Sequence, residues 1–229
     1  MNGDPAGQDK QHAPAVLGKR QQGIEDRRRR LVKAASDLIA ERDDGSFSMP
    51  ELAERAGLSL ATPYNLFGSK AAVLVQVFER LVRGFHRDTL WMAGLPASDR
   101  VLGVIDRLIV AYERQGRLFR NLWKALYGLD VSEHRQLNLS LSHQIVGPLV
   151  ESLAADQLLP PDLPPVAIEI TLVRIFDANF EQWAAQDWTP HYLRIQLRAS
   201  FALVFLGLFD QHDRARLAAV IRETPADLS

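Results

Sequence analysis

Apolar residues recur at helical spacing through almost the whole chain after its first 23 residues. The clearest run spans 71–85, where seven apolar side chains fall on one face of a helix. Polar and apolar residues nowhere alternate over a stretch long enough to indicate a β-strand. The pattern therefore predicts an all-α fold.

The first part of the chain predicts four helices separated by short turns. One runs from Ile24 to a loop at 43–45, and Ser48 caps a second that ends at Gly57. Ser59 is expected to cap a third helix of about two turns, and Gly68 with Ser69 separates this helix from a long fourth one. Further helices are expected at 98–115, 116–129, 132–155, 166–186, 190–209 and 213–222, with a proline-rich break at 160–165 and a cap at Thr189.

Composition narrows the class of protein. The chain has 229 residues, 27 Lys and Arg against 28 Asp and Glu, and no cysteine. The net charge of −1 excludes a globally basic protein that coats nucleic acid, so any DNA contact must be local. The lack of cysteine excludes disulfides, thiolate nucleophiles and Cys-ligated zinc, and no His-x-x-x-His pair suggests another metal site. We expect no metal and no cofactor.

The termini carry no targeting signal that the sequence reveals. Residues 1–23 lack the apolar stretch of a signal peptide, and the apolar run 201–209 is far shorter than the ~18 residues of a membrane span. A protein without membrane association, located in the cytoplasm, is the expectation. The first 23 residues show no periodicity and are interpreted as a disordered tail.

Two short helices joined by residues 56–59 have the shape of a helix-turn-helix. In this motif the first helix crosses the DNA backbone, and the second enters a major groove about 12 Å wide. An ordinary helical hairpin has the same spacing, so the spacing alone leaves both interpretations open.

The residues themselves resemble the TetR family of transcriptional regulators. The resemblance lies in Arg-Leu-Val-Lys-Ala-Ala at 30–35, Met-Pro-Glu-Leu-Ala-Glu-Arg-Ala-Gly-Leu-Ser at 49–59, and Ala-Thr-Pro-Tyr-Asn-Leu-Phe-Gly-Ser-Lys at 61–70. It covers residues 28–74 and implies a DNA-binding domain at 24–70 followed by a helical effector-binding and dimerisation domain at 71–229. It also implies a repressor that binds a palindromic operator as a homodimer.

By this resemblance the second helix of the motif faces the DNA, with Pro63 and Phe67 turned inward. Tyr64 and Lys70 are expected to contact phosphates, and the first amides of the next helix are oriented toward an anion. The DNA-contacting set comprises Arg28, Ser48, Ser59, Leu60, Ala61, Thr62, Tyr64, Asn65, Leu66, Ser69 and Lys70.

The same helix departs from the family pattern at Pro63 and at Asn65-Leu66, where an aromatic residue and His or Tyr are more usual. Pro63 stands where an apolar residue such as Leu is usual, and it predicts a slightly unwound first turn. No Arg or Lys precedes position 70, so the helix lacks the arginine that pairs with guanine. Asn65 suits adenine, and nearby methyl groups suit thymine, so we expect half-sites to be read partly through A·T pairs. Replacing those thymines by uracil should weaken binding.

Four consecutive arginines at 27–30, with Lys19 and Arg20 before them, have two interpretations. They contact phosphates or a minor groove as a flexible arm does, or they form a solvated helix start. Arginines at a helix N-terminus oppose the helix dipole, so the sequence offers no stability reason for them.

The C-terminal helices supply the implied dimer and effector sites. The segment 190–209 is apolar around most of its circumference, so the last two long helices are the expected dimer interface, with a plain internal helix as the alternative. An aromatic set with few polar groups is the expected pocket for a small apolar or aromatic effector. It comprises Phe85, Trp91, Tyr112, Phe119, Trp123, Tyr127, Phe176, Asn179 and Trp183.

Two other classes of protein stay open on the sequence. An all-α enzyme would need catalytic residues scattered over helices, because no nucleophile elbow, phosphate-binding loop or dinucleotide fingerprint is present. A helical adaptor would bind a partner protein through its apolar last helix and keep a vestigial DNA-binding head. Specific duplex binding separates both from a regulator.

Overall fold

The computed structural model describes residues 18–89, 92, 94–129, 131–186 and 188–225, without side-chain placement for 86–89, 127 and 131–140. Its described residues form helices and no strand, which confirms the all-α prediction. The helices are α1 (Lys19–Glu41), α2 (Met49–Arg55), α3 (Ala61–Phe67), α4 (Lys70–Thr89), α5 (Ala97–Arg114), α6 (Gly116–Tyr127), α7 (Val131–Ala155), α8 (Pro165–Gln186), α9 (Pro190–Leu206) and α10 (Gln211–Arg222).

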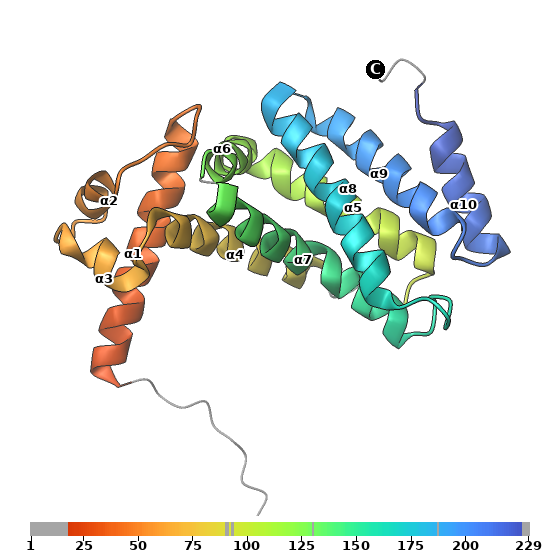
Figure 1. Cartoon of the computed structure of the whole chain (residues 1–229), viewed down its shortest axis with the longest axis horizontal. Coiled ribbons are helices and arrows are strands. Elements are labelled where there is room, and N and C mark those ends of the chain that lie inside the picture. The colour runs from red at the N-terminus through yellow and green to blue at the C-terminus, as the bar shows by residue number, and fades with distance from the viewer. Residues whose placement is uncertain (1–17, 90–91, 93, 130, 187, 226–229) are drawn as a thin grey trace, which may run out of the picture.

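The helices form an elongated molecule with two unlike ends (Figure 1). Helices α1–α3 lie together at one end and are called the head. Helix α4 runs from the head into a layer of longer helices, α5–α9, called the core, and α10 covers the opposite end. Helix α1 packs against both α4 and α6, so the head is joined to the core along α1.

Helix α1 begins at Lys19, where the sequence predicted a disordered tail up to residue 23. The prediction was wrong for residues 19–23 because it relied on apolar spacing. These residues are exposed or half-buried and form a helix without a packed face, and Lys, Arg and Gln favour a helix on their own. The earlier residues of the expected tail, 1–17, lie outside the described part of the chain.

The centre of the core is aromatic. The Trp123 indole donates a hydrogen bond to the Tyr112 hydroxyl over 3.0 Å, and the Trp123 ring stacks on Phe180 with centroids 5.3 Å apart. Phe176 and Trp183 pack against Phe180 from the same helix, α8. All five side chains are at most 2% exposed, so they anchor α5, α6 and α8 to one another.

Polar contacts join α10 to α5, and α5 to the end of α7, at the end of the core opposite the head. The Asp213 carboxylate, 8% exposed at the start of α10, accepts hydrogen bonds from the Ser98 amide (2.9 Å) and hydroxyl at the start of α5. Arg100, 4% exposed, forms an ion pair of 2.6 Å with Asp156 after α7. None of the described helices combines the length and hydropathy required to cross a bilayer.

Candidate nucleic-acid interface

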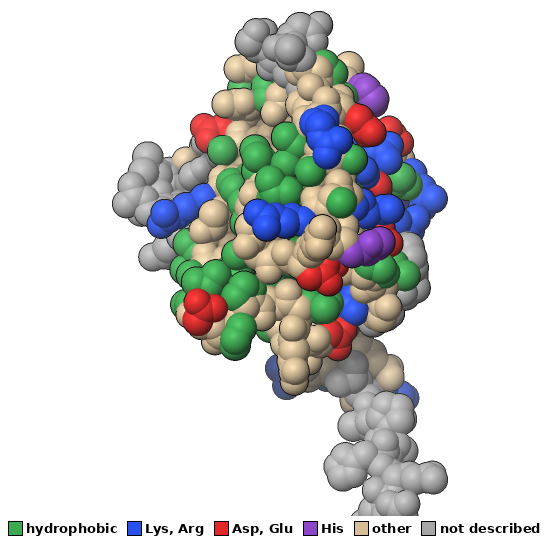
Figure 2. Space-filling view, turned by 90° about the vertical axis from the view of Figure 1, so that its right-hand side faces the viewer, with side chains coloured by type: hydrophobic (Ala, Val, Ile, Leu, Met, Phe, Trp, Pro, Cys, Tyr) green, Lys and Arg blue, Asp and Glu red, His purple; other side chains and the backbone are tan. Residues whose placement is uncertain are grey.

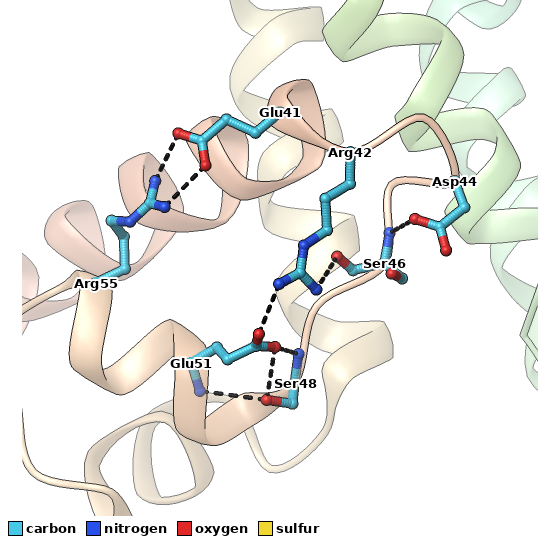
Figure 3. Close-up of polar contacts among 7 residues, drawn as sticks. All are labelled: Glu41, Arg42, Asp44, Ser46, Ser48, Glu51 and Arg55. Atoms are coloured by element: carbon cyan, nitrogen blue, oxygen red, sulfur yellow. Dashed lines mark hydrogen bonds and ion pairs between the residues drawn. The ribbon is translucent and has the colours of Figure 1, made fainter.

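Helix α2 begins with a capping box, as its sequence predicts. The Ser48 hydroxyl accepts a hydrogen bond from the Glu51 amide, and the Glu51 carboxylate accepts one of 2.8 Å from the Ser48 amide (Figure 3). Pro50 occupies the first turn, where a missing N–H costs little. The guanidinium of Arg42 first, and then the Ser48 amide and hydroxyl, lower the pKa of Glu51 from 4.5 to about 2.

Two ion pairs hold α2 against the end of α1. Arg42 contacts Glu51 over 2.6 Å, and Arg55 makes a two-pronged contact with Glu41 at 2.7 and 2.8 Å (Figure 3). The Arg55 guanidinium is the main cause of a lowered pKa at Glu41. The pairs clamp α2 to α1 from both of its ends, and sequence reasoning missed them because the partners lie 9 and 14 positions apart.

The turn between α2 and α3 is fixed by a glycine and an arginine. Gly57 has a φ of +62°, the left-handed conformation that the sequence predicts for a glycine ending α2. The Arg30 guanidinium donates hydrogen bonds to the carbonyls of Ala56 and Gly57, the latter over 3.0 Å. Arg30 thereby supplies donors for carbonyls that the end of α2 leaves without helical partners.

Helix α3 begins at Ala61, and Ser59 does not cap it as predicted. The Ser59 hydroxyl pairs with the Thr62 hydroxyl over 2.8 Å, and the Thr62 amide donates to the Ser59 carbonyl. The predicted unwinding by Pro63 is also absent, since α3 is regular from Ala61 to Phe67. Pro63 lies in the first turn, where its missing N–H breaks no bond, and its ring is buried as expected.

One face of α3 is left open to solvent. Leu60 is 63% exposed and Tyr64 51% exposed, and Ala61 and Asn65 lie exposed beside them. The Asn65 amide and the Tyr64 hydroxyl form no hydrogen bond with the described residues. Apolar and polar groups thus share an outward stripe with unused bonding capacity, which suits the edges of base pairs.

The other predicted contact residues border this stripe. Thr62 and Leu66 are half-buried, whereas Ser59 is exposed. The Ser69 hydroxyl accepts a hydrogen bond from the Ala72 amide over 3.1 Å and so caps α4. The Lys70 ammonium lies 5.0 Å from the centre of the Phe47 ring, a cation–π contact that holds the half-buried side chain in place.

Arg28, one of the predicted DNA contacts, also contacts the protein itself. Its guanidinium donates a 3.3 Å hydrogen bond to the Leu66 carbonyl and lies 5.7 Å from the centre of the Phe67 ring. Together with Arg30 it ties α1 to both helices of the motif. The sequence offered no stability reason for the arginine run, and for these two residues the structure supplies one.

The head meets the core at a close contact that the sequence did not reveal. The Asn121 side chain of α6 donates hydrogen bonds of 3.0 and 2.7 Å to the carbonyls of Ile39 and Arg42 at the end of α1. Gly45 has a φ of +64°, and a Cβ there would lie 2.1 Å from the Asn121 carbonyl oxygen. A long-range contact of this kind leaves no periodic signal in sequence.

The predicted effector residues largely share one place, inside the core. Phe85, Tyr112, Phe119, Trp123, Phe176 and Trp183 are each at most 7% exposed. Asn179 is half-buried and donates to the Ile175 carbonyl of its own helix. Trp91 lies outside the described residues, and so does the side chain of Tyr127. A separate apolar cavity of about 10 Å³ between α5, α7, α8 and α9 touches this set through Phe176.

Most of the predicted dimer helix faces inward. Leu193, Leu197 and Phe205 of α9 are fully buried in the core. For these side chains the structure agrees with the alternative that α9 is an internal helix. A smaller apolar surface stays open, formed by Leu203 of α9 at 59% exposure and by Val166 and Ile170 of α8 at 56% and 37%.

Comparison with known proteins agrees with this geometry. Residues 31–77 match the family described as bacterial regulatory proteins, tetR family. The HTH-type transcriptional regulator BetI of Agrobacterium fabrum is 31% identical over 144 residues, which make up 59% of this chain and 66% of that protein. The chain thus spans slightly less than two thirds of the length of this curated relative.

Solved structures share the fold. A FadR from Thermus thermophilus, a TetR-family repressor in complex with lauroyl-CoA, superposes with a TM-score of 0.64 at 22% identity over 80% of this chain and 96% of that one. A TetR transcriptional regulator from Rhodococcus sp. RHA1 superposes with a TM-score of 0.60 at 18% identity over 82% and 99%. With the motif and the exposed α3, residues 31–77 are similar to the tetR family of bacterial regulatory proteins, and the described chain shares the fold of solved TetR-family structures.

Proposed function

We propose that this chain regulates transcription by binding a palindromic DNA operator as a homodimer and that it is a repressor released by a small apolar or aromatic effector. Because its target is chromosomal DNA, the protein acts in the cytoplasm. The match of residues 31–77 to a family of regulatory proteins favours a regulator over an enzyme.

The observation that carries the proposal is the open face of α3. Leu60 and Tyr64 are large apolar groups left in water on a helix of two turns, next to an Asn65 amide without a partner among the described residues. Apolar groups left exposed together on a folded protein mark a surface that binds a partner. A major groove supplies thymine methyl groups, adenine edges and nearby phosphates for these side chains.

A dimer follows from the size of the head. One short helix reaches few base pairs, so two heads about 34–36 Å apart must read a palindrome together. The open apolar surface of Val166, Ile170 and Leu203 on the last two long helices supports pairing there. The remainder of the predicted interface is internal, so the pairing surface is narrower than the sequence indicates.

The proposed effector site is the apolar interior of the core. The cavity of about 10 Å³ is lined by nine apolar side chains from α5, α7, α8 and α9, and it holds no more than one water molecule. Its walls must separate to admit a ligand. The FadR from Thermus thermophilus, which has the same fold, is in complex with lauroyl-CoA, and this supports a site for an apolar ligand.

The test is binding to a duplex selected from random sequence, compared with a scrambled duplex of equal length. Tyr64→Ala should weaken binding to the selected duplex about tenfold, because it removes a groove contact worth about 1–3 kcal/mol. Leu163→Ala, an exposed apolar residue outside the head, is the matched control and should leave affinity unchanged.

Two outcomes would contradict the proposal. Equal affinity of the wild-type chain for selected and scrambled duplexes would mean that α3 reads no sequence. Unchanged binding in Tyr64→Ala would remove the open face of α3 as the contact surface and favour the adaptor interpretation.

A further inference from the structure

A hollow of about 480 Å³ lies where the head meets the core, and neither the family assignment nor the proposed function uses it. Its walls come from α1, α4 and the turn between α5 and α6. We call it the junction hollow. Because α1 belongs to the head and the α5–α6 turn to the core, a ligand in it contacts both parts of the molecule.

The junction hollow is strongly basic. Four cationic side chains line it, Lys33, Arg80, Arg114 and Arg117, against the single carboxylate of Asp37, which gives a net charge of +3. The whole chain, by contrast, has a net charge of −1. Positive charge gathered in a concave site raises the local concentration of anions.

Two of these cations have no partner among the described residues. The side chains of Arg80 and Arg114 form no hydrogen bond or ion pair with any described residue. Lys33 pairs with Asp37 over 2.7 Å, and Arg117 lies 3.4 Å from Asp43, which is 98% exposed. Arg80 and Arg114 therefore remain available for an anion that enters the hollow.

Backbone donors are also present. Helix α6 begins at Gly116 inside the hollow, and its N-cap residue Gln115 makes no side-chain cap. No acidic residue lies in the first turn of α6. The first amides of a helix have no partners within the helix, so they can donate hydrogen bonds to an anion in the hollow.

The position of the hollow separates it from the DNA-contacting surface. Arg28 marks the contact of α1 with α3, whereas the part of α1 that lines the hollow runs from Lys33 to Ala40. These two residues lie about 7 and 18 Å from residue 28 along α1 at 1.5 Å per residue. Residues of α3 do not line the hollow. A small molecule fits a concave site in this place better than a DNA backbone does.

We propose that the junction hollow binds a small phosphate-bearing anion of at least two negative charges, held by Arg80, Arg114, Arg117 and the first amides of α6. Such an anion also lies against α1 of the head, whose Lys33 lines the hollow, and so joins α1 to the α5–α6 turn and stabilises one position of the head relative to the core. This site is distinct from the apolar interior and requires no DNA.

Calorimetric titration of the full-length protein with inorganic pyrophosphate, at constant ionic strength, tests the proposal. One saturable site per chain is expected. Arg80→Gln combined with Arg114→Gln should raise the dissociation constant at least about tenfold, because it removes two of the charged groups that donate hydrogen bonds to the anion. Arg214→Gln, an exposed arginine of α10, is the matched control and should bind as the wild type does.

Three results would overturn the proposal. They are the absence of saturable heat with the wild-type protein, an equal loss in the control variant, and unchanged affinity in the double variant. A parallel titration with duplex DNA tests whether the phosphate that these arginines bind belongs to DNA instead of a small anion. If the double variant lowers the salt dependence of duplex binding while pyrophosphate does not bind, the arginines contact DNA and the small-anion site does not exist. Binding of duplex DNA by the wild-type protein tests the proposed function, and binding of pyrophosphate tests the junction hollow. Either proposal can therefore fail while the other stands.

Discussion

At the residue scale, two arginines of the 27–30 run are structural in this fold. Arg28 and Arg30 donate to carbonyls at the ends of α3 and α2. Each carbonyl would otherwise depend on water at a helix end, so the guanidinium groups brace the motif from α1. The sequence places positive charge at the start of α1, but spacing cannot tell which arginine turns back toward the protein.

Arg30→Ala should lower the free energy of unfolding by about 1–2 kcal/mol, because it removes charged donors from the carbonyls of Ala56 and Gly57. Urea denaturation followed by circular dichroism measures the change. Arg27→Ala is the control, since Arg27 is exposed and donates only to the Gly23 carbonyl of its own helix. Equal losses in the two variants would show that Arg30 does not brace the turn.

Gly45 gives a second prediction at this scale. Gly45→Ala should destabilise the protein by more than about 2 kcal/mol, since a Cβ would collide with the Asn121 carbonyl at a φ of +64°. Gly68→Ala is the matched control, with a φ of +77° but no atom within 4 Å of the added Cβ. We expect a loss of about 1 kcal/mol there. Similar midpoints of urea unfolding for the two variants would contradict a steric head–core joint.

At the element scale, ion pairs hold helix α2 against the end of α1. Glu51 takes part in the capping box and pairs with Arg42, and Glu41 pairs with Arg55. The pKa values of both carboxyl groups lie below their ordinary range. The capping box could be predicted from Ser48 and Glu51, three residues apart. The pairs to Arg42 and Arg55 could not, because they depend on how α2 packs on α1.

This arrangement predicts acid sensitivity of the head. The folded state holds the pKa of Glu51 at about 2, below its usual 4.5. Its stabilising effect is therefore complete above about pH 4.5 and is lost as the pH falls toward 2. Urea midpoints measured between pH 6 and pH 3 should fall less steeply in Glu51→Gln than in the wild type.

Glu54→Gln is the control for the acid series. Glu54 is exposed on the same helix and forms no side-chain hydrogen bond or ion pair with the described residues. Its pH profile should follow the wild type. A profile in Glu51→Gln as steep as the wild-type profile would show that the contacts of Glu51 do not stabilise the head.

At the scale of the whole molecule, the sequence predicts the order and type of the helices well. Apolar spacing and punctuation by Gly, Ser and Pro placed each described helix within a few residues, apart from the start of α1. The helix α9 shows why faces are harder to assign. Its apolar circumference was interpreted as an interface, but α5, α8 and α10 cover most of it.

The surface at the α10 end of the molecule carries both hydrophobic and basic side chains (Figure 2). Figure 2 looks onto the end of the molecule that carries α10 and shows hydrophobic side chains gathered over part of that face, with Lys and Arg among them. The open apolar groups of α8 and α9 are few, so a single charge among them should oppose pairing.

Leu203→Glu should raise the dissociation constant of the proposed homodimer at least about 30-fold, because it places a charge in the proposed apolar contact and removes a side chain worth about 2 kcal/mol. Sedimentation equilibrium measures the change. Ala215→Glu, at an exposed position of α10, is the matched control and should leave the association unchanged. An equally tight dimer in both variants would place the interface on another surface.

Selection of random duplexes by the purified full-length protein tests the central claim most directly. We expect a palindrome whose half-sites contain A·T pairs at the positions facing α3, with binding that weakens steeply as salt rises. Recovery of no shared sequence, with only weak salt-sensitive binding, would contradict the assignment of α3 as a reader of DNA sequence.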